Sequence, residues 1–187
     1  MGYFDTEEHI EQYLELADGY DGKIIIDQLK DYLETGKTVL ELGMGPGKDL
    51  LMLEESYTVT GSDNARLFLE RFLKVHPDAD LLELDAVTLA SSRRFDCIYS
   101  NKVFQHLSYE EMAGSFKRQT ELLNSGGLLV HSFWYGTEIE QFDDLMFYQV
   151  TEDILTPMIE DLFEVLKMER YTEMEADDSL LLILRSR

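Results

Sequence analysis

The sequence has little of what stabilises secreted or membrane proteins. It contains one cysteine, Cys97, so no disulfide can form within the chain, which fits a reducing cytoplasm. Its three prolines are scattered, and no apolar run reaches the length of about 20 residues that crosses a bilayer. The opening segment, residues 1–12, is acidic and polar, so we expect no signal peptide and no membrane partner.

Basic residues are also scarce. The chain has 16 Lys and Arg against 38 Asp and Glu, a formal net charge of −22. Binding to a phosphate backbone depends on Lys and Arg, and the largest basic cluster is the pair in SSRRF at 91–95. We therefore expect no nucleic-acid partner. The charge is explained by solubility, which we favour over the specific recruitment of a basic partner.

Short apolar segments alternate with amphipathic segments along most of the chain. The segments predicted to be strands are 38–43, 57–63, 79–85, 95–101 and 126–134. The segments predicted to be helices are 6–17, 22–34, 48–56, 64–75 and 108–124. This alternation is typical of a parallel sheet with helices on both faces, a Rossmann-like three-layer α/β sandwich.

The last part of the sequence departs from this alternation. Segments 162–172 and 179–187 both have strand character, and the loop between them has no room for a crossover helix. Two strands joined in this way must be antiparallel. Before them, 151–161 is predicted to be a helix, with Thr151 as a possible N-cap and Pro157 as a point where the helix kinks or splits.

The segment TVLELGMGPGKDLLML, residues 38–53, runs from a predicted strand into a predicted helix. Its three glycines are Gly43, Gly45 and Gly47. Glycines at such a turn allow the backbone to approach a ligand closely. The spacing is too short for a phosphate-binding P-loop, and Asp49 stands where that loop has a hydroxyl. It also departs from the dinucleotide pattern G-x-G-x-x-G, because Lys48 occupies the third glycine position.

Three acids narrow the choice of ligand. Glu41 lies inside the strand before the glycines, where a carboxylate would repel a diphosphate but attract a cationic amino group. Asp63 ends the next strand, 20 residues after Gly43, where a carboxylate can accept both ribose hydroxyls. Asp85 ends the third strand, within reach of an adenine amino group. The ligand predicted is an adenosine with a positive charge and no phosphate, and S-adenosylmethionine fits this description.

The ordered segments resemble the class I S-adenosylmethionine-dependent methyltransferases. VLELGMGPGKDLLML resembles their glycine-rich first motif, VTGSDNA the second-strand motif and LLELDAVTL the third. FDCIYSNKVFQHLSYEEM resembles the fourth-strand segment, and LLNSGGLLVHSFW the helix leading into the fifth strand. The resemblance covers residues 36 to 134 and implies a seven-stranded sheet, mostly parallel, with the last strand inserted antiparallel. This agrees with the antiparallel tail.

We therefore expect one domain, residues 1–187, of the small single-domain type with a small-molecule substrate. Residues 1–36 would form a helical cap, 37–134 the cofactor-binding half and 135–187 the acceptor side with a loop, a helix and the antiparallel strand pair. The cap helices either close over the cofactor as a lid or simply pack on the domain. Within the acceptor side, the aromatic and acidic segment 133–150 either lines an acceptor pocket or forms a packed surface.

The predicted cofactor residues each have a structural alternative. The three glycines either approach the ligand or serve only a tight turn, and Glu41 either contacts the cofactor or binds backbone amides. Asp85 contacts the adenine or caps the turn that follows, and in the first case Ala86 supplies a backbone amide. Asn64 contacts the cofactor or caps a helix. Asn101, at the end of the fourth strand, contacts the ligand or is only a polar strand end, and the adjacent Lys102 is interpreted as a solvated charge.

His106 is the candidate catalytic residue, as a base for an alcohol or phenol acceptor, although a packed histidine is the alternative. His131, inside the fifth strand, is less favoured. The four histidines and Cys97 have no spacing for a metal site, so no metal is predicted.

The resemblance implies transfer of a methyl group from S-adenosylmethionine, leaving S-adenosylhomocysteine, by direct displacement with proximity and desolvation. The acceptor is predicted to be a small molecule, and the acidic aromatic segment hints at an amine. Two alternatives stay open. One is a catalytically silent module of this fold that binds cofactor or a partner, and the other is an NAD-dependent oxidoreductase, which Lys48 and Glu41 disfavour.

Overall fold

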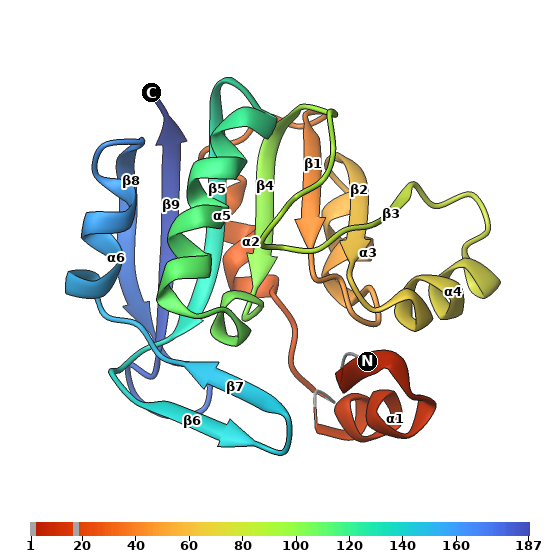
Figure 1. Ribbon diagram of the computed structural model, residues 1–187. Coiled ribbons are helices and arrows are strands. Elements are labelled where there is room, and N and C mark those ends of the chain that lie inside the picture. The colour runs from red at the N-terminus through yellow and green to blue at the C-terminus, as the bar shows by residue number, and fades with distance from the viewer. Residues whose placement is uncertain (1–2, 17–18) are drawn as a thin grey trace.

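The computed structural model describes residues 3–16 and 19–187. Its centre is a seven-stranded sheet in the order β3-β2-β1-β4-β5-β9-β8, and a two-stranded hairpin, β6-β7, lies apart from it (Figure 1). The strands are β1 (Thr38–Leu42), β2 (Thr58–Asp63), β3 (Leu81–Glu83), β4 (Phe95–Asn101), β5 (Leu123–Trp134), β6 (Ile139–Phe142), β7 (Leu145–Tyr148), β8 (Phe163–Tyr171) and β9 (Ser179–Ser186). The helices are η1 (Tyr3–Asp5), α1 (Glu7–Leu16), α2 (Lys23–Leu29), α3 (Lys48–Glu54), α4 (Arg66–Val75), η2 (Phe104–His106), α5 (Tyr109–Leu122) and α6 (Glu152–Ile159).

The sheet is mixed in the way the sequence predicts. β3, β2, β1, β4 and β5 pair in parallel, whereas β9 is antiparallel to both of its neighbours, β5 and β8. The last strand is therefore inserted between β5 and the edge strand β8. The predicted Rossmann-like fold class is confirmed.

Side chains alternate between the two faces of the central strands, as the period of a strand requires. Leu40 and Ile98 point into a core beneath α5 and α6, while Val39 and Tyr99 point into a second core beneath α2, α3 and α4. Each face is thus covered by helices, and this makes three layers. Central strands buried on both faces explain the nearly continuous apolar runs in the sequence.

Several boundaries differ from the sequence prediction. α2 ends at Leu29 instead of continuing to residue 34, and β3 contains only three of the seven residues predicted in 79–85. α5 passes directly into β5, which begins at Leu123. α6 runs through Pro157 as one helix, and Thr151 occupies its N-cap without a side-chain hydrogen bond. The end of the predicted first helix, residue 17, lies outside the described residues.

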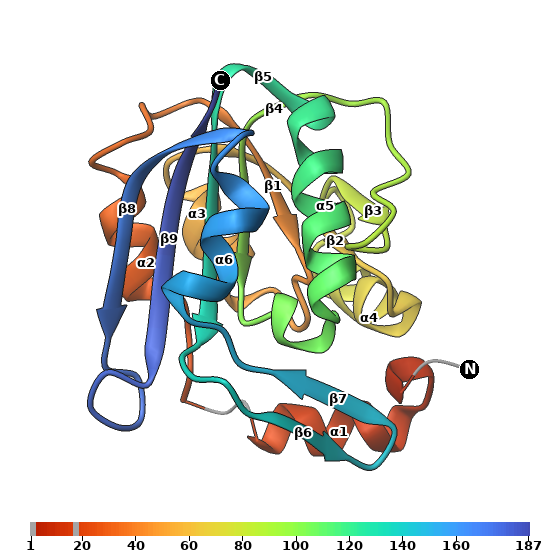
Figure 2. The same ribbon diagram turned by 60° about the vertical axis from the view of Figure 1, so that its left-hand side comes forward.

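The main departure is in the segment predicted as a loop after β5. Its residues form the β6-β7 hairpin, which lies with α1 near the carboxyl ends of the parallel strands (Figures 1 and 2). α1 is held against α4 by Arg71, which pairs with Glu7 and Glu11, and by Ile10 packed on Phe68. The hairpin and α1 therefore flank the carboxyl ends of the parallel strands, where open α/β sheets bind their ligands. No helix in the described part of the chain is long and apolar enough to cross a membrane.

Candidate functional site

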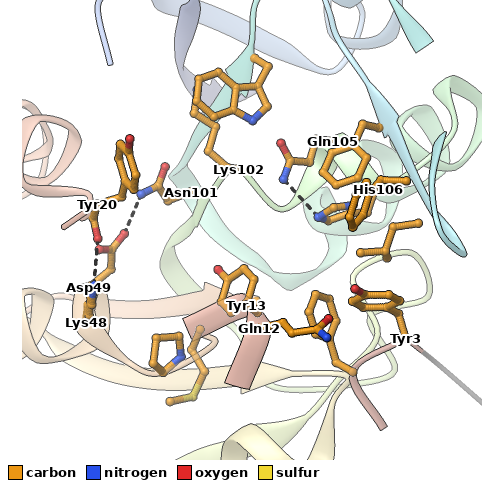
Figure 3. Close-up of a pocket in the computed structure, with 18 of the residues that line it drawn as sticks. Tyr3, Gln12, Tyr13, Tyr20, Lys48, Asp49, Asn101, Lys102, Gln105 and His106 are labelled. Carbon is orange, nitrogen blue, oxygen red and sulfur yellow. Dashed lines mark hydrogen bonds between the residues drawn. The ribbon is translucent and has the colours of Figure 1, made fainter. Parts of the chain in front are cut away.

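Two adjoining cavities lie at the carboxyl ends of β1, β2 and β4. The larger has a volume of about 710 Å³ and the smaller about 440 Å³. They share walls from the N-terminal segment, the glycine loop and the β4–η2 segment, namely Tyr3, Phe4, Tyr13, Gly43, Asn101, Lys102, Gln105 and His106, together with Leu145 of the hairpin. Figure 3 shows Asp49, Lys48 and Tyr20 across the space from Gln105 and His106, with Gln12 and Tyr13 of α1 between them. A ligand can therefore extend from one cavity into the other.

The glycine loop has backbone angles that only glycine adopts without strain. Gly43, Gly45 and Gly47 have φ angles of 65°, 49° and 83°. A Cβ atom on Gly43 would lie 2.5 Å from Val103 Cγ2, and one on Gly47 would lie 2.3 Å from Phe72 Cε2. A Cβ atom on Gly45, by contrast, would lie 3.6 Å from its nearest neighbour, the Tyr13 ring. Gly43 and Gly45 line the cavities, whereas Gly47 lies outside both walls and packs against α4.

Asp63 fixes the shape of this loop. Its Oδ2 accepts a hydrogen bond from the Gly45 amide at 2.9 Å, and its Oδ1 accepts one from the Ala65 amide at 2.8 Å. Burial raises the pKa of the Asp63 carboxyl, and the backbone hydrogen bonds of Ala65 and Gly45 oppose that rise. The Asn64 amide is a third backbone donor to this carboxyl, so about one of its four acceptor positions is left for a ligand hydroxyl while it holds the loop.

Glu41 is buried beneath the loop and is not part of either cavity wall. Its side chain is 3% exposed, and its Oε2 is buried without a hydrogen-bond partner among the described residues. Burial, followed by the charges of Asp49 and Asp63, raises the pKa of the Glu41 carboxyl well above its usual range. The alternative that backbone amides satisfy this carboxylate does not hold for Oε2.

Asp49, in the first turn of α3, connects three parts of the chain. Its Oδ1 accepts from the Gly22 amide at 2.7 Å, and its Oδ2 accepts from the Tyr99 hydroxyl at 2.7 Å and from Asn101 Nδ2 at 3.1 Å. A Cβ on Gly22 would lie only 2.1 Å from the Tyr99 oxygen. Asp49 thus ties the segment after α1 to the end of β4, in the wall of the larger cavity. Sequence reasoning used this residue only to exclude a P-loop.

The third acidic position faces the smaller cavity and also serves a turn. Asp85 Oδ1 accepts from the amides of Val87 and Thr88, as the structural alternative predicted, and the side chain remains exposed in the cavity wall. Ala86 lies beside it, with its carbonyl accepting from Ser115 Oγ at 2.6 Å. Asn64 also lines this cavity, but α4 has Ala65 at its N-cap, so the capping alternative for Asn64 is wrong.

Lys102 is only partly exposed and its ammonium has partners within the protein, which contradicts its interpretation as a solvated charge. Its side chain is 12% exposed and its ammonium lies 3.7 Å from the centre of the Trp134 ring. Nζ donates to the Phe133 carbonyl at 2.8 Å and to Ser179 Oγ at 2.6 Å, and it pairs with Glu173 at 3.1 Å. Burial lowers the pKa of Lys102 to about 8, against the opposing charge of Glu173. The residue joins β4, β5 and the β8–β9 loop.

His106 lies where the two cavities meet. Its Nδ1 donates to the Met146 carbonyl of β7 at 3.1 Å, which leaves Nε2 as the acceptor, and Gln105 Nε2 donates to it at 3.1 Å (Figure 3). Burial lowers the pKa of His106, opposed by the hydrogen bond to Met146. A neutral imidazole has the form that a general base requires, and here the Gln105 amide must turn away from Nε2 before that atom takes up a proton.

His131 has a structural role instead. It is fully buried, with Nδ1 against Ser100 Oγ at 2.7 Å and Nε2 against Gln119 Oε1 at 2.9 Å. Burial lowers the pKa of His131 to about 3. It touches neither cavity.

The structure thus gathers most of the predicted site residues around one continuous space. Those that line it are Gly43, Gly45, Asp63, Asn64, Asp85, Ala86, Asn101 and His106. Glu41 and Gly47 lie outside both cavity walls. Asp49 and Gln105 line the larger cavity although the sequence analysis did not assign them to the site, whereas Phe142 and Phe147 belong to segment 133–150, for which an acceptor pocket was one of the two alternatives. For Asp49, an acid among the apolar residues that open a helix was the available signal.

Comparisons with known proteins follow the same pattern. Residues 39–127 match a family model described as "Methyltransferase domain". A protein of Geobacillus thermodenitrificans (strain NG80-2) named "Uncharacterized methyltransferase" is 28% identical over 178 residues, which cover 94% of this chain and 79% of that protein.

Solved methyltransferase structures share the fold. The 1,6-didemethyltoxoflavin-N1-methyltransferase of Burkholderia thailandensis, with bound 1,6-didemethyltoxoflavin and S-adenosylhomocysteine, superposes with a TM-score of 0.80 at 17% identity, covering 94% of this chain and 82% of that chain. The N-methyltransferase NodS of Bradyrhizobium japonicum WM9, in complex with S-adenosylhomocysteine, has a TM-score of 0.73 at 16% identity, covering 97% and 98% of the two chains. Family model, relative and solved structures together show that the chain is similar to methyltransferases and has their fold.

Proposed function

We propose that this protein binds S-adenosylmethionine in the smaller cavity and transfers its methyl group to a small-molecule acceptor in the larger one. The observation that carries the proposal is the Asp63 carboxylate, which holds the glycine loop, lines the smaller cavity and keeps an acceptor position beyond its three backbone hydrogen bonds. Such a carboxylate suits the two hydroxyls of a ribose. Two neighbours with known ligands contain S-adenosylhomocysteine, which supports the same cofactor and product here.

The walls of the smaller cavity fit an adenosine without phosphate. Leu84, Val87 and Phe68 offer apolar surface for a base, and the Asp85 carboxylate lies among them to accept from an amino group. Lys102 is the one Lys or Arg side chain in the wall formed by the described residues, and three oxygens already surround its ammonium. A diphosphate would therefore find no ion pair, whereas buried Glu41 and Asp49 favour a cationic ligand.

When bound, S-adenosylmethionine supplies an electrophilic methyl group, so the protein must align an acceptor and exclude water. Tyr13 of α1 lies over Gly45, and the hairpin contributes Leu145 and Phe147 to the opposite wall. These two flanking segments enclose the region where the cavities join. We infer that they limit access of water, in line with a direct displacement assisted by proximity and desolvation.

His106 is proposed as the proton acceptor for acceptors that must lose a proton. The hydrogen bond to Met146 fixes its tautomer, so Nε2 is the atom that takes up the proton. Gln105 Oε1 is buried without a partner among the described residues. Rotation of the Gln105 amide would turn this oxygen toward a protonated Nε2 and stabilise it. Gln105 is thus proposed to position and support the base.

The negative charge of the chain argues against nucleic acid as the acceptor. The buried, unpaired Cys97 is consistent with the cytoplasmic location expected from the sequence. A small molecule matches the volume of the larger cavity, about 710 Å³.

Calorimetric titration with S-adenosylmethionine, with NAD as the control ligand, tests the proposal. We expect the Asp63→Asn variant to bind S-adenosylmethionine about 10- to 100-fold more weakly, because charge-assisted hydrogen bonds contribute about 1.5–3 kcal/mol. Asp78→Asn is the matched control, since Asp78 is exposed and lies outside both cavities. Binding that is absent in the folded wild-type protein, or unchanged in Asp63→Asn, would contradict the assignment.

A further inference from the structure

The larger cavity, proposed above for the acceptor, is rich in carboxylates. Its wall contains Glu15, Asp21, Asp49, Asp143 and Glu173. Three of them, Glu15, Asp21 and Asp143, take part in no ion pair among the described residues, and Asp49 is bonded only to neutral donors. The field inside such a cleft is focused by its low-dielectric walls, so it attracts cations.

The two basic side chains of the same wall do not cancel this field for a ligand. Lys102 is surrounded by a carbonyl, a hydroxyl and the Glu173 carboxylate, which use its three N–H groups. Lys48 donates to the Tyr20 carbonyl at 3.4 Å, and its side chain lies next to Asp49 (Figure 3). The carboxylates of the wall would therefore repel an acceptor that carries a carboxylate or phosphate. Lys102 could not bind such a group without losing its present partners.

Aromatic and apolar groups complete the cavity. Trp134 and Phe147 lie in the wall, and the ammonium of Lys102 already rests on the Trp134 ring, so this aromatic wall accommodates an ammonium in contact with an acid. Three further wall residues are exposed although large and apolar. They are Tyr20 (40%), Phe142 (59%) and Met174 (58%), and each comes from a different segment. Exposed apolar groups converging on one opening indicate a partner surface of the same character.

We infer that the acceptor is a hydrophobic amine whose nitrogen enters the acidic cavity while its apolar body covers Tyr20, Phe142 and Met174. The inference rests on the proposed methyl transfer and names its substrate class. The amine binds as an ammonium and loses one proton to His106 Nε2. Its lone pair then forms the nitrogen–carbon bond as the sulfur–carbon bond breaks, and those electrons remain on sulfur.

Three ligands that share one apolar body separate the possibilities: phenylbutylamine, phenylbutanol and phenylbutyrate. We would measure their binding to the full chain by calorimetry, with and without S-adenosylhomocysteine, so that no turnover is needed. The amine should bind at least about 10-fold more tightly than the acid, and the difference should shrink as salt is raised. Equal or tighter binding of the alcohol or the acid would overturn the inference, as would no binding of the amine at millimolar concentration.

A pair of hairpin variants locates the effect. Asp143 lines the cavity and the adjacent Asp144 does not, so Asp143→Asn and Asp144→Asn remove the same charge from neighbouring positions. We expect Asp143→Asn to weaken amine binding about threefold, as is typical for one partly solvated charge, and Asp144→Asn to leave it unchanged. Equal effects of both would refute a site in this cavity. Titration of S-adenosylmethionine in the same samples reports separately on the proposed function, because loss of amine preference with intact cofactor binding affects only the acceptor class.

Discussion

Glu41→Gln should make the protein more stable at neutral and alkaline pH. The wild-type carboxyl is 3% exposed, has a buried oxygen without a partner among the described residues, and faces the charges of Asp49 and Asp63. An unsatisfied buried polar group costs about 1–3 kcal/mol, and more when it is charged. The glutamine side chain has the same shape and no charge. We therefore expect a gain of about 2 kcal/mol, or roughly 4–8 °C in Tm for a chain of this size.

The pH dependence gives the sharper test. Because the pKa of Glu41 is raised in the folded state, the folded protein binds the proton more tightly than the unfolded chain. Wild-type stability from this group is thus greatest below the usual pKa near 4.5 and is lost as pH rises through the raised value. The advantage of Glu41→Gln should therefore be largest at pH 8 and shrink as pH falls toward 5.

Urea denaturation of both proteins across this pH series measures the difference. Glu54→Gln is the control, because Glu54 is exposed on α3 and contributes only the last of the charges that act on Glu41. Glu54→Gln should change the free energy of unfolding by no more than about 0.5 kcal/mol. A Glu41→Gln protein that is less stable than wild type at pH 8, or whose difference does not vary with pH, would refute the reasoning. The same variant should bind S-adenosylmethionine more weakly, since a cationic ligand loses a nearby charge.

Three further changes test other parts of the site. Gly43→Ala should cost at least about 2 kcal/mol and weaken cofactor binding, because its φ is 65° and its Cβ would meet a valine, whereas Gly114→Ala in α5 has open space and should be neutral or stabilising by denaturation. Lys102→Met should remove a rise in stability between pH 8 and 10 that the wild type owes to this lysine. The pKa of Lys102 is about 8 in the folded state, below the ordinary 10.5, so the unfolded chain binds more protons in this range and stability rises with pH. Urea denaturation that shows the same dependence on pH in both proteins would contradict this. Arg71→Ala should speed hydrogen exchange in α1 while global stability changes by less than about 1 kcal/mol, and Arg66→Ala, which loses only a pair within α4, should leave exchange in α1 unchanged.

The sheet and the glycine loop could be predicted from the sequence because both are encoded locally. Alternation of strand and helix patterns identifies parallel strands, and the short link before β9 forces it to be antiparallel. The loop needs positive φ angles at three positions, and a glycine in the sequence marks each of them. Asp63 was found by its spacing, which follows from the length of one strand–helix–strand unit.

Other features depend on contacts between distant residues. The partners of Asp49 are 27, 50 and 52 positions away, so no local pattern reveals its role. The environment of Lys102 likewise depends on distant residues, because Trp134 contacts it from β5 and Glu173 from the β8–β9 loop. The β6-β7 hairpin was missed because its strands are exposed or half-buried throughout and its turn carries a positive φ at Asp143, where glycine or asparagine is usual.

The position of β9 sets an order in which the molecule can assemble. β8 precedes β9 along the chain, yet it is joined to the sheet only through β9, which lies between it and β5. During synthesis, β8 therefore has no strand partner until residues 179–186 have left the ribosome. The same holds for its exposed side chain Val165. The rest of the parallel sheet can form earlier. Like β1, whose neighbours β2 and β4 also follow it in the chain, β8 is a sheet strand whose neighbours are all made later, so chaperone binding to the nascent chain should include β8.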